Sequence, residues 1–373
     1  MNQVKKYLEK MKIIQENLLD YLDNEEDSDE NFEKFQKIYN DQNIYDNKHE
    51  LKLILYLLSN LSNNHHRTPH FYDKIDRILK DFQGNIKKFY INSEIFNIFK
   101  NNKRNLLFLI KEQIITIDEY IFNTFTSTEY LSNNYHQYFA PEIKQFLEKN
   151  PHNENKLTKD NINDINADLP DYFEENRLNG ENHNYICETI QKDSIDDFIV
   201  YINKHECLLD SKIPQSIYET NSFLLKMKDT SLIEYAIFYG SIQILKYLQL
   251  NNVKLLPSFF YYAIYGRNAE IIHILEEMSF YNAYQIYPKC CKLAIKCHHN
   301  DIASYYVETN DNFLNSILHF NKPFKYYNFA FIEYNFVKGD NFYVFCKYDY
   351  YIIAKYMLNS NKFNINEIRK IEI

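Results

Sequence analysis

The stretch SLIEYAIFYGSIQILKYL, from Ser231 to Leu248, recurs in altered form twice further along the chain. Its counterparts are SFFYYAIYGRNAEIIHIL, from Ser258 to Leu275, and KCCKLAIKCHHNDIASYY, from Lys289 to Tyr306. Each copy has Ala-Ile at its sixth and seventh places, and further apolar residues eight, nine and twelve places after the alanine. This spacing predicts two short antiparallel helices per copy, because the small alanine lets the two helices approach closely.

Weaker copies flank these three. Residues Thr189–Ile202 resemble a leading unit, which is followed by a long insert through Lys228, and Lys347–Leu358 resemble a closing unit. Before them, residues 151–183 are rich in Asn, Asp and Glu and poor in apolar residues, which is typical of a linker. We therefore expect an all-α, helical-repeat solenoid. It would comprise an N-terminal helical region at 1–150, a linker at 151–183 and a repeat array of about five units at 184–373.

The N-terminal region opens with the clearest helical pattern in this half of the chain. Apolar residues recur at helical spacing between Val4 and Leu22 and predict one broad buried stripe. An acidic stretch, Asn24–Asn31, follows, and we expect it to form a loop that leads into the negatively charged first turn of the next helix.

The three copies resemble ankyrin repeats, whose unit is roughly 33 residues long. Gly240 matches the glycine that ends the first helix in a left-handed C-cap; Arg267 and His298 take that place in the next two copies, and histidine is among the few other residues enriched at positive φ. The consensus Pro and His are absent from all three copies. The chain is similar to a degenerate, uncharacterised ankyrin-type family expanded in trichomonad protists. That resemblance implies a helical array and protein interaction, and no known reaction.

The overall composition excludes several classes of function. The formal net charge of −9 argues against a nucleic-acid binder, and with 5 Gly in the chain no phosphate-cradling glycine motif occurs. Six Cys without framework spacing, and no N-terminal apolar segment, predict a reducing, cytoplasmic setting. No apolar run approaches the roughly 18 residues of a membrane span, so we expect no membrane insertion.

The stretch KCCKLAIKCHHND, from Lys289 to Asp301, could instead hold a metal ion. That interpretation would use Cys291, Cys297 and one histidine, with His319 as a fourth ligand. Aligned with the other copies, Cys291 falls on a core position, His298 on the C-cap, and Asn300 and Asp301 at the start of the second helix. Each residue then has a structural role, so we predict no metal here and no cofactor.

A second histidine group lies at Asn63–Phe71. His66 and His70 have the i, i+4 spacing of a helical metal pair, but Pro69 stands between them and favours a loop or a helix start. We predict no metal at this position either.

No catalytic motif emerges. The sequence has no GxSxG elbow, HExxH or Cys–His signature, and the acidic pairs Asp196-Asp197 and Glu276-Glu277 fit the solvated faces of helices. We therefore expect a non-enzymatic scaffold that binds another protein through the concave face of its array. Two alternatives remain: an enzyme or enzyme subunit with its site in the N-terminal helical region, and self-association through exposed tyrosines.

Overall fold

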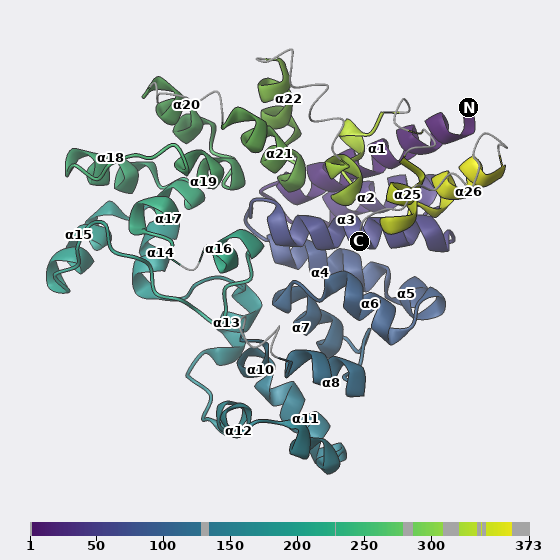
Figure 1. Cartoon of the computed structure of the whole chain (residues 1–373), viewed down its shortest axis with the longest axis horizontal. Helices are drawn as coiled ribbons and strands as arrows, with labels where there is room; N and C mark the ends of the chain where they lie inside the picture. Colours follow the sequence, from purple (N-terminus) through teal and green to yellow (C-terminus); the bar gives the residue numbers. More distant parts are fainter. Residues whose placement is uncertain are drawn as a thin grey trace. The chain divides into compact units, whose positions relative to one another are not determined.

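The computed structural model describes residues 2–127, 134–227, 229–278, 286–308, 321–333, 337 and 341–359. Within these ranges every regular element is a helix, and the β-contact is an isolated antiparallel bridge between Lys212 and Ser231. The expectation of an all-α fold is confirmed. The chain forms two compact units (Figure 1). Unit 1 comprises Met1–Asn60, Thr68–Lys74 and Tyr287–Ile373, and unit 2 comprises Leu61–Arg67 and Ile75–Ile286.

Unit 1 joins the first helices of the chain to its last ones. Its described elements are α1 (Asn2–Asp23), α2 (Asp29–Asp41), α3 (Lys48–Asn64, continuing into unit 2), the start of α4 (Phe71–Asp81), α21 (Tyr287–Cys297), α22 (Asn300–Glu308), α24 (Lys322–Lys325), the 3-10 helix η3 (Phe329–Phe331), α25 (Phe342–Lys347) and α26 (Tyr351–Asn359).

Helix α1 carries the core of unit 1. Met11, Ile14 and Leu18 are fully buried, as the predicted apolar stripe requires, and α1 packs against both α2 and η3. The acidic stretch after α1 also behaves as predicted: Ser28 caps α2 by accepting a hydrogen bond from Asn31 N, and Asp29 is in the first turn. Both expectations for this region are confirmed.

Unit 2 contains the middle of the chain. Its described elements are the rest of α4, α5 (Gln83–Phe89), α6 (Asn92–Phe99), α7 (Lys103–Lys111), α8 (Glu119–Phe125), α10 (Tyr135–Tyr138), α11 (Ala140–Lys149), the 3-10 helix η1 (Pro151–Lys156), α12 (Lys159–Asn166), α13 (Phe173–Asn179), α14 (Tyr185–Gln191), α15 (Ile195–Lys204), α16 (Ser222–Lys226), α17 (Leu232–Tyr239), α18 (Ile242–Leu250), α19 (Phe259–Tyr265) and α20 (Ala269–Glu277).

Residues 151–183, whose composition indicated a linker, carry η1, α12 and α13. Arg177 explains why this polar segment is ordered: the side chain is 1% exposed and makes a bidentate ion pair with Glu142, at 2.7 Å and 3.0 Å. Tyr138 closes the arrangement, since its hydroxyl donates to Arg177 O and its carbonyl accepts from Arg177 Nη1. Charged contacts thus add to the burial of the few apolar side chains of the segment, Ile165 and Phe173. The predicted domain limits at 150 and 183 stay a prediction.

The described part of the chain contains no helix that is both long enough and apolar enough to cross a membrane.

Candidate functional site

Pairs of helices joined by a left-handed residue are the recurring feature of both units. Gly240 (φ 74°) lies between α17 and α18, Arg267 (φ 52°) between α19 and α20, and His298 (φ 60°) between α21 and α22. The predicted left-handed conformation of His298 is confirmed. Similar turns contain Asp193, between α14 and α15, and Asp349, between α25 and α26.

The Ala-Ile signature of the sequence has a structural reason in these turns. The amide after the left-handed residue donates to the alanine carbonyl: Ser241 to Ala236 (2.9 Å), Asn268 to Ala263 (3.3 Å) and His299 to Ala294 (3.0 Å). The amide of the left-handed residue itself donates to the following isoleucine carbonyl in each copy. These are the two bonds of a Schellman motif, so the signature marks the last helical turn.

Successive turns are stacked within each unit. In unit 2, Ser241 Oγ donates to Ile190 O at the end of α14, and the Asp193 carboxylate caps α18 by accepting from Gln243 N and Ile244 N, both at 3.0 Å. In unit 1, Asn328 Nδ2 donates to Ile295 O at 2.9 Å. This bond corresponds to the one from Ser241 to Ile190, because in both a side chain of one turn donates to a carbonyl in the last turn of a preceding helix. At Ser241 and Asn328, a polar side chain of one turn therefore links it to the preceding helix pair.

The cysteines of Lys289–Asp301 are core side chains. Cys290, Cys291 and Cys297 are buried, and Cys291 Sγ donates to Ala303 O at 3.6 Å. Burial raises the pKa of both Cys291 and Cys297 to about 12, so both are protonated thiols at neutral pH. A metal ligand must be a thiolate. His319, the fourth ligand of the metal interpretation, lies outside the described residues.

His298 belongs to a buried polar network of unit 1. One of its ring nitrogens, Nε2, lies 2.9 Å from Tyr326 O, and the other, Nδ1, lies 3.3 Å from Gln15 Nε2. Gln15, from α1, also donates to Asn328 Oδ1 at 2.9 Å and accepts from Phe329 N. Both ring nitrogens of His298 are thus engaged, which favours a structural role for this histidine.

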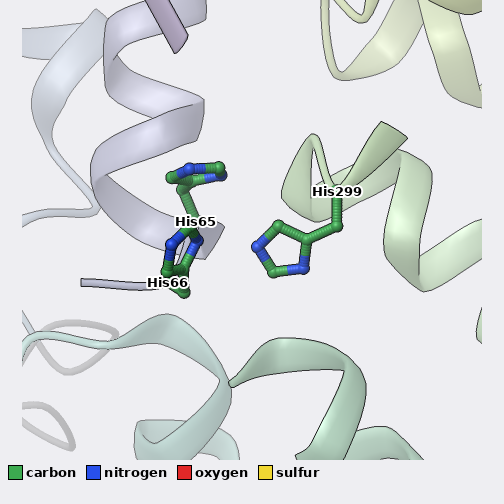
Figure 2. A group of neighbouring side chains, drawn as sticks. All are labelled: His65, His66 and His299. Carbon is green, nitrogen blue, oxygen red and sulfur yellow. The ribbon is translucent and has the colours of Figure 1, made fainter. Parts of the chain in front are cut away.

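His65, His66, His70 and His299 lie at helix ends, and Figure 2 draws three of them. In unit 2, His65 and His66 follow the last turn of α3, with ring centroids 4.4 Å apart and planes tilted by 54°. In unit 1, His299 is fully buried where it precedes α22. Also in unit 1, His70 has φ 60° and precedes α4, and its Nδ1 lies 3.2 Å from Asp73. The absence of a resident metal stays a prediction.

Unit 2 also holds a buried ionic cluster that the motif search missed. Arg67 donates to Gly180 O (3.1 Å), Glu181 Oε1 (3.2 Å) and Thr220 Oγ1 (2.8 Å), and lies 3.8 Å from Glu219. Glu219 is 6% exposed, and its Oε1 accepts from the amides of Thr220 and Asn221. Burial raises the Glu219 pKa above its ordinary value. The only sequence signal for this cluster was the short basic group His65–Arg67 at the end of a helix.

Lys103 of unit 2 is a buried base whose pKa lies far below its ordinary value. Burial lowers its pKa to about 7, although the nearby Glu219 carboxylate acts in the opposite direction. Its Nζ donates to Ile217 O and lies 5.1 Å from the Tyr138 ring centroid, and the residue is only 2% exposed. An amine held in this way can titrate near neutral pH, but its burial leaves it closed to a substrate in this structure.

A small cavity of about 70 Å³ lies beside this cluster within unit 2. Its lining is mixed: it includes the polar residues Ser216, Glu219 and Thr230 and the apolar residues Ile213, Leu224 and Met227. The volume suits a few water-sized groups rather than a cofactor. Neither Lys103 nor Arg67 lines it, so the cavity does not combine the acid and the base of the cluster.

The first and second helices of the pairs differ sharply in exposure within unit 2. No residue of α17 or α19 is exposed, whereas α15, α18 and α20 each keep one solvated face. The insert before α17 explains the difference. Its Phe223, in α16, stacks on Tyr265 at 4.0 Å and meets Tyr262 edge-on at 4.8 Å. The first helices are thus covered by the chain's own segment.

No protein-family model matches this chain, and neither a curated protein nor a solved structure matches it.

Proposed function

We propose that the chain is a non-enzymatic scaffold that binds another protein through an ankyrin-like array of stacked helix pairs. The observation that carries this proposal is the Schellman turn repeated at Gly240, Arg267 and His298, with Ser241 and Asn328 linking neighbouring turns. Stacked pairs of short helices bury one continuous core and leave a broad outer surface, which is how repeat proteins hold partners. The net charge of −9 favours a protein over a nucleic acid as that partner.

A cytoplasmic location is part of the proposal. All six cysteines are free thiols, and four of them, Cys187, Cys290, Cys291 and Cys297, are buried as core side chains. An oxidising compartment favours disulfides in secreted chains, whereas buried unpaired thiols are ordinary in a reducing one.

The test is capture of the tagged full chain from its native cell, followed by reconstitution with each captured protein in purified form. We expect at least one protein to bind the purified chain at a fixed stoichiometry, with no substrate turned over. If no captured protein binds in reconstitution, the scaffold proposal fails. The enzyme alternative predicts instead that the purified chain by itself turns over a small molecule.

A further inference from the structure

The outer face of unit 2 presents an apolar row in repeat register. Val200, Tyr247 and Ile274 each lie seven residues after the left-handed residue of their own turn. Val200 is 64% exposed and the other two are half-buried. These positions are equivalent in α15, α18 and α20, which follow one another along unit 2 (Figure 1), so we infer that the three residues form one row across successive second helices.

Contacts between the second helices keep this row continuous. The Phe198 and Tyr247 rings meet edge-on at 6.0 Å and join α15 to α18, while Lys246 and Glu270, 3.4 Å apart, join α18 to α20. Leu250, at the end of α18, extends the apolar surface and is 83% exposed. Apolar side chains exposed at equivalent positions of successive helices, unlike a single exposed leucine, are typical of a protein-binding site.

Acidic side chains border the row. Asp196 and Glu270 lie one helical turn before it, at equivalent positions of α15 and α20, and both are exposed. Glu277 lies one turn after it and is exposed too. Lys246 lies 3.4 Å from Glu270 and His273 lies 3.2 Å from Glu277, so part of this charge is compensated on the face itself. Acidic residues still outnumber Lys on α15, α18 and α20, and this excess can attract cationic side chains while the apolar row buries the hydrophobic face of the same ligand.

Among the described residues of unit 2, the first helices expose little apolar surface apart from Tyr185 of α14, which is 57% exposed. Phe223 covers Tyr262 and Tyr265, and α17 and α19 expose no residue. We propose, building on the scaffold function above, that the partner docks on the second helices α15, α18 and α20 rather than on the concave face expected from the sequence. The ligand is a protein segment that carries apolar anchors among Lys and Arg residues.

The experiment selects 16-residue phage-displayed random peptides on the immobilised full chain, and measures the affinity of the best peptide by fluorescence anisotropy. The face variant is Asp196→Lys with Val200→Lys, an acid and an apolar residue four apart on an exposed helix face. The matched control is Glu9→Lys with Ile13→Lys, which has the same spacing and charge change on the exposed face of α1. Circular dichroism and the melting temperature establish that both variants fold.

We expect selected peptides rich in Lys, Arg and apolar residues, with at least tenfold weaker binding to the face variant and less than twofold change with the control. Recovery of no peptide, of acidic peptides, or of peptides that bind both variants equally would overturn the docking surface. The captured native partner separates the two proposals. A partner that still binds the face variant at full affinity rejects the surface and keeps the scaffold function, whereas the absence of any reconstituted partner rejects the scaffold function itself.

Discussion

Gln15 shows how a single buried amide can join two turns of unit 1. Its side chain donates to Asn328 Oδ1 and accepts from Phe329 N, and all of these groups are buried. We expect Gln15→Ala to lower the free energy of unfolding by about 2–4 kcal/mol, because an acceptor and a backbone donor lose their partner inside the core. Urea unfolding measures the change. Gln3→Ala, at an exposed position of the same helix, should stay within about 0.5 kcal/mol; equal losses in the two variants would contradict the role assigned to Gln15.

Lys103 makes the stability of the folded chain depend on pH. Its pKa is about 7 in the folded chain, mainly because of burial, and about 10.4 when unfolded. The unfolded state therefore binds more protons between pH 7 and pH 10, and stability rises with pH through that window by up to about 1.4 kcal/mol per unit. Below pH 7 Lys103 is protonated in both the folded and the unfolded state, so folding bears the full free-energy cost of burying its charge.

Lys103→Met should remove this contribution. We expect the variant to be more stable than the wild type at pH 7, and the difference to shrink as the pH rises towards 9. Other groups titrate alike in both proteins, so the difference between their pH profiles isolates Lys103. Urea unfolding at pH 7, 8 and 9 measures it, and parallel profiles would reject the depressed pKa.

At the scale of helix pairs, two glycines have different physical roles. Gly240 has φ 74°, which a side chain adopts only with strain, whereas Gly266 has ordinary dihedrals. A Cβ added at Gly266 would lie 2.1 Å from Phe238 O, so the glycine allows α19 to approach the end of α17. We expect Gly266→Ala to cost more than about 3 kcal/mol and Gly240→Ala about 1–2 kcal/mol.

Gly84, in α5, is the matched control for these two substitutions. A Cβ there meets nothing within 4 Å, so Gly84→Ala should be neutral or stabilise by up to about 1 kcal/mol. Thermal unfolding of the three variants gives the order. A Gly266→Ala protein as stable as the Gly240→Ala protein would show that α19 can move away from α17 at little cost.

The helix pairs could be predicted from sequence because their determinants are local. Ala236 and Ile237 supply the two carbonyls of the turn that follows them, so one short pattern specifies helix, cap and next helix. The pattern did not reveal that α16 covers the first helices, because Phe223 reaches Tyr265 across an insert with no repeat of its own. Nor did residues 151–183 reveal their helices, since few apolar residues mark them and α13 is held largely by the ion pair of Arg177 with Glu142.

For the whole molecule, the polar clusters lie beyond what sequence patterns can predict. Gln15 and Asn328 are 313 residues apart, and Arg67 and Glu181 are 114 apart. Neither pair belongs to a motif, and a buried glutamine in α1 has many potential partners until the fold selects one. The same long-range contacts decide whether a histidine is a ligand or a core residue, which is why His298 was ambiguous until its two ring partners were known.

The metal content of the purified chain tests whether Cys291, Cys297 and His298 are structural side chains or metal ligands. Cys291 and Cys297 are thiols with a pKa of about 12, and both ring nitrogens of His298 are engaged. Zinc binding would require two buried thiols to lose their protons and would couple metal directly to folding. We expect less than about one zinc per ten chains by plasma emission spectroscopy. The melting temperature should stay unchanged within about 1 °C in roughly 5 mM EDTA. One zinc per chain, together with a melting temperature that falls on chelation, would overturn the structural roles given to these side chains.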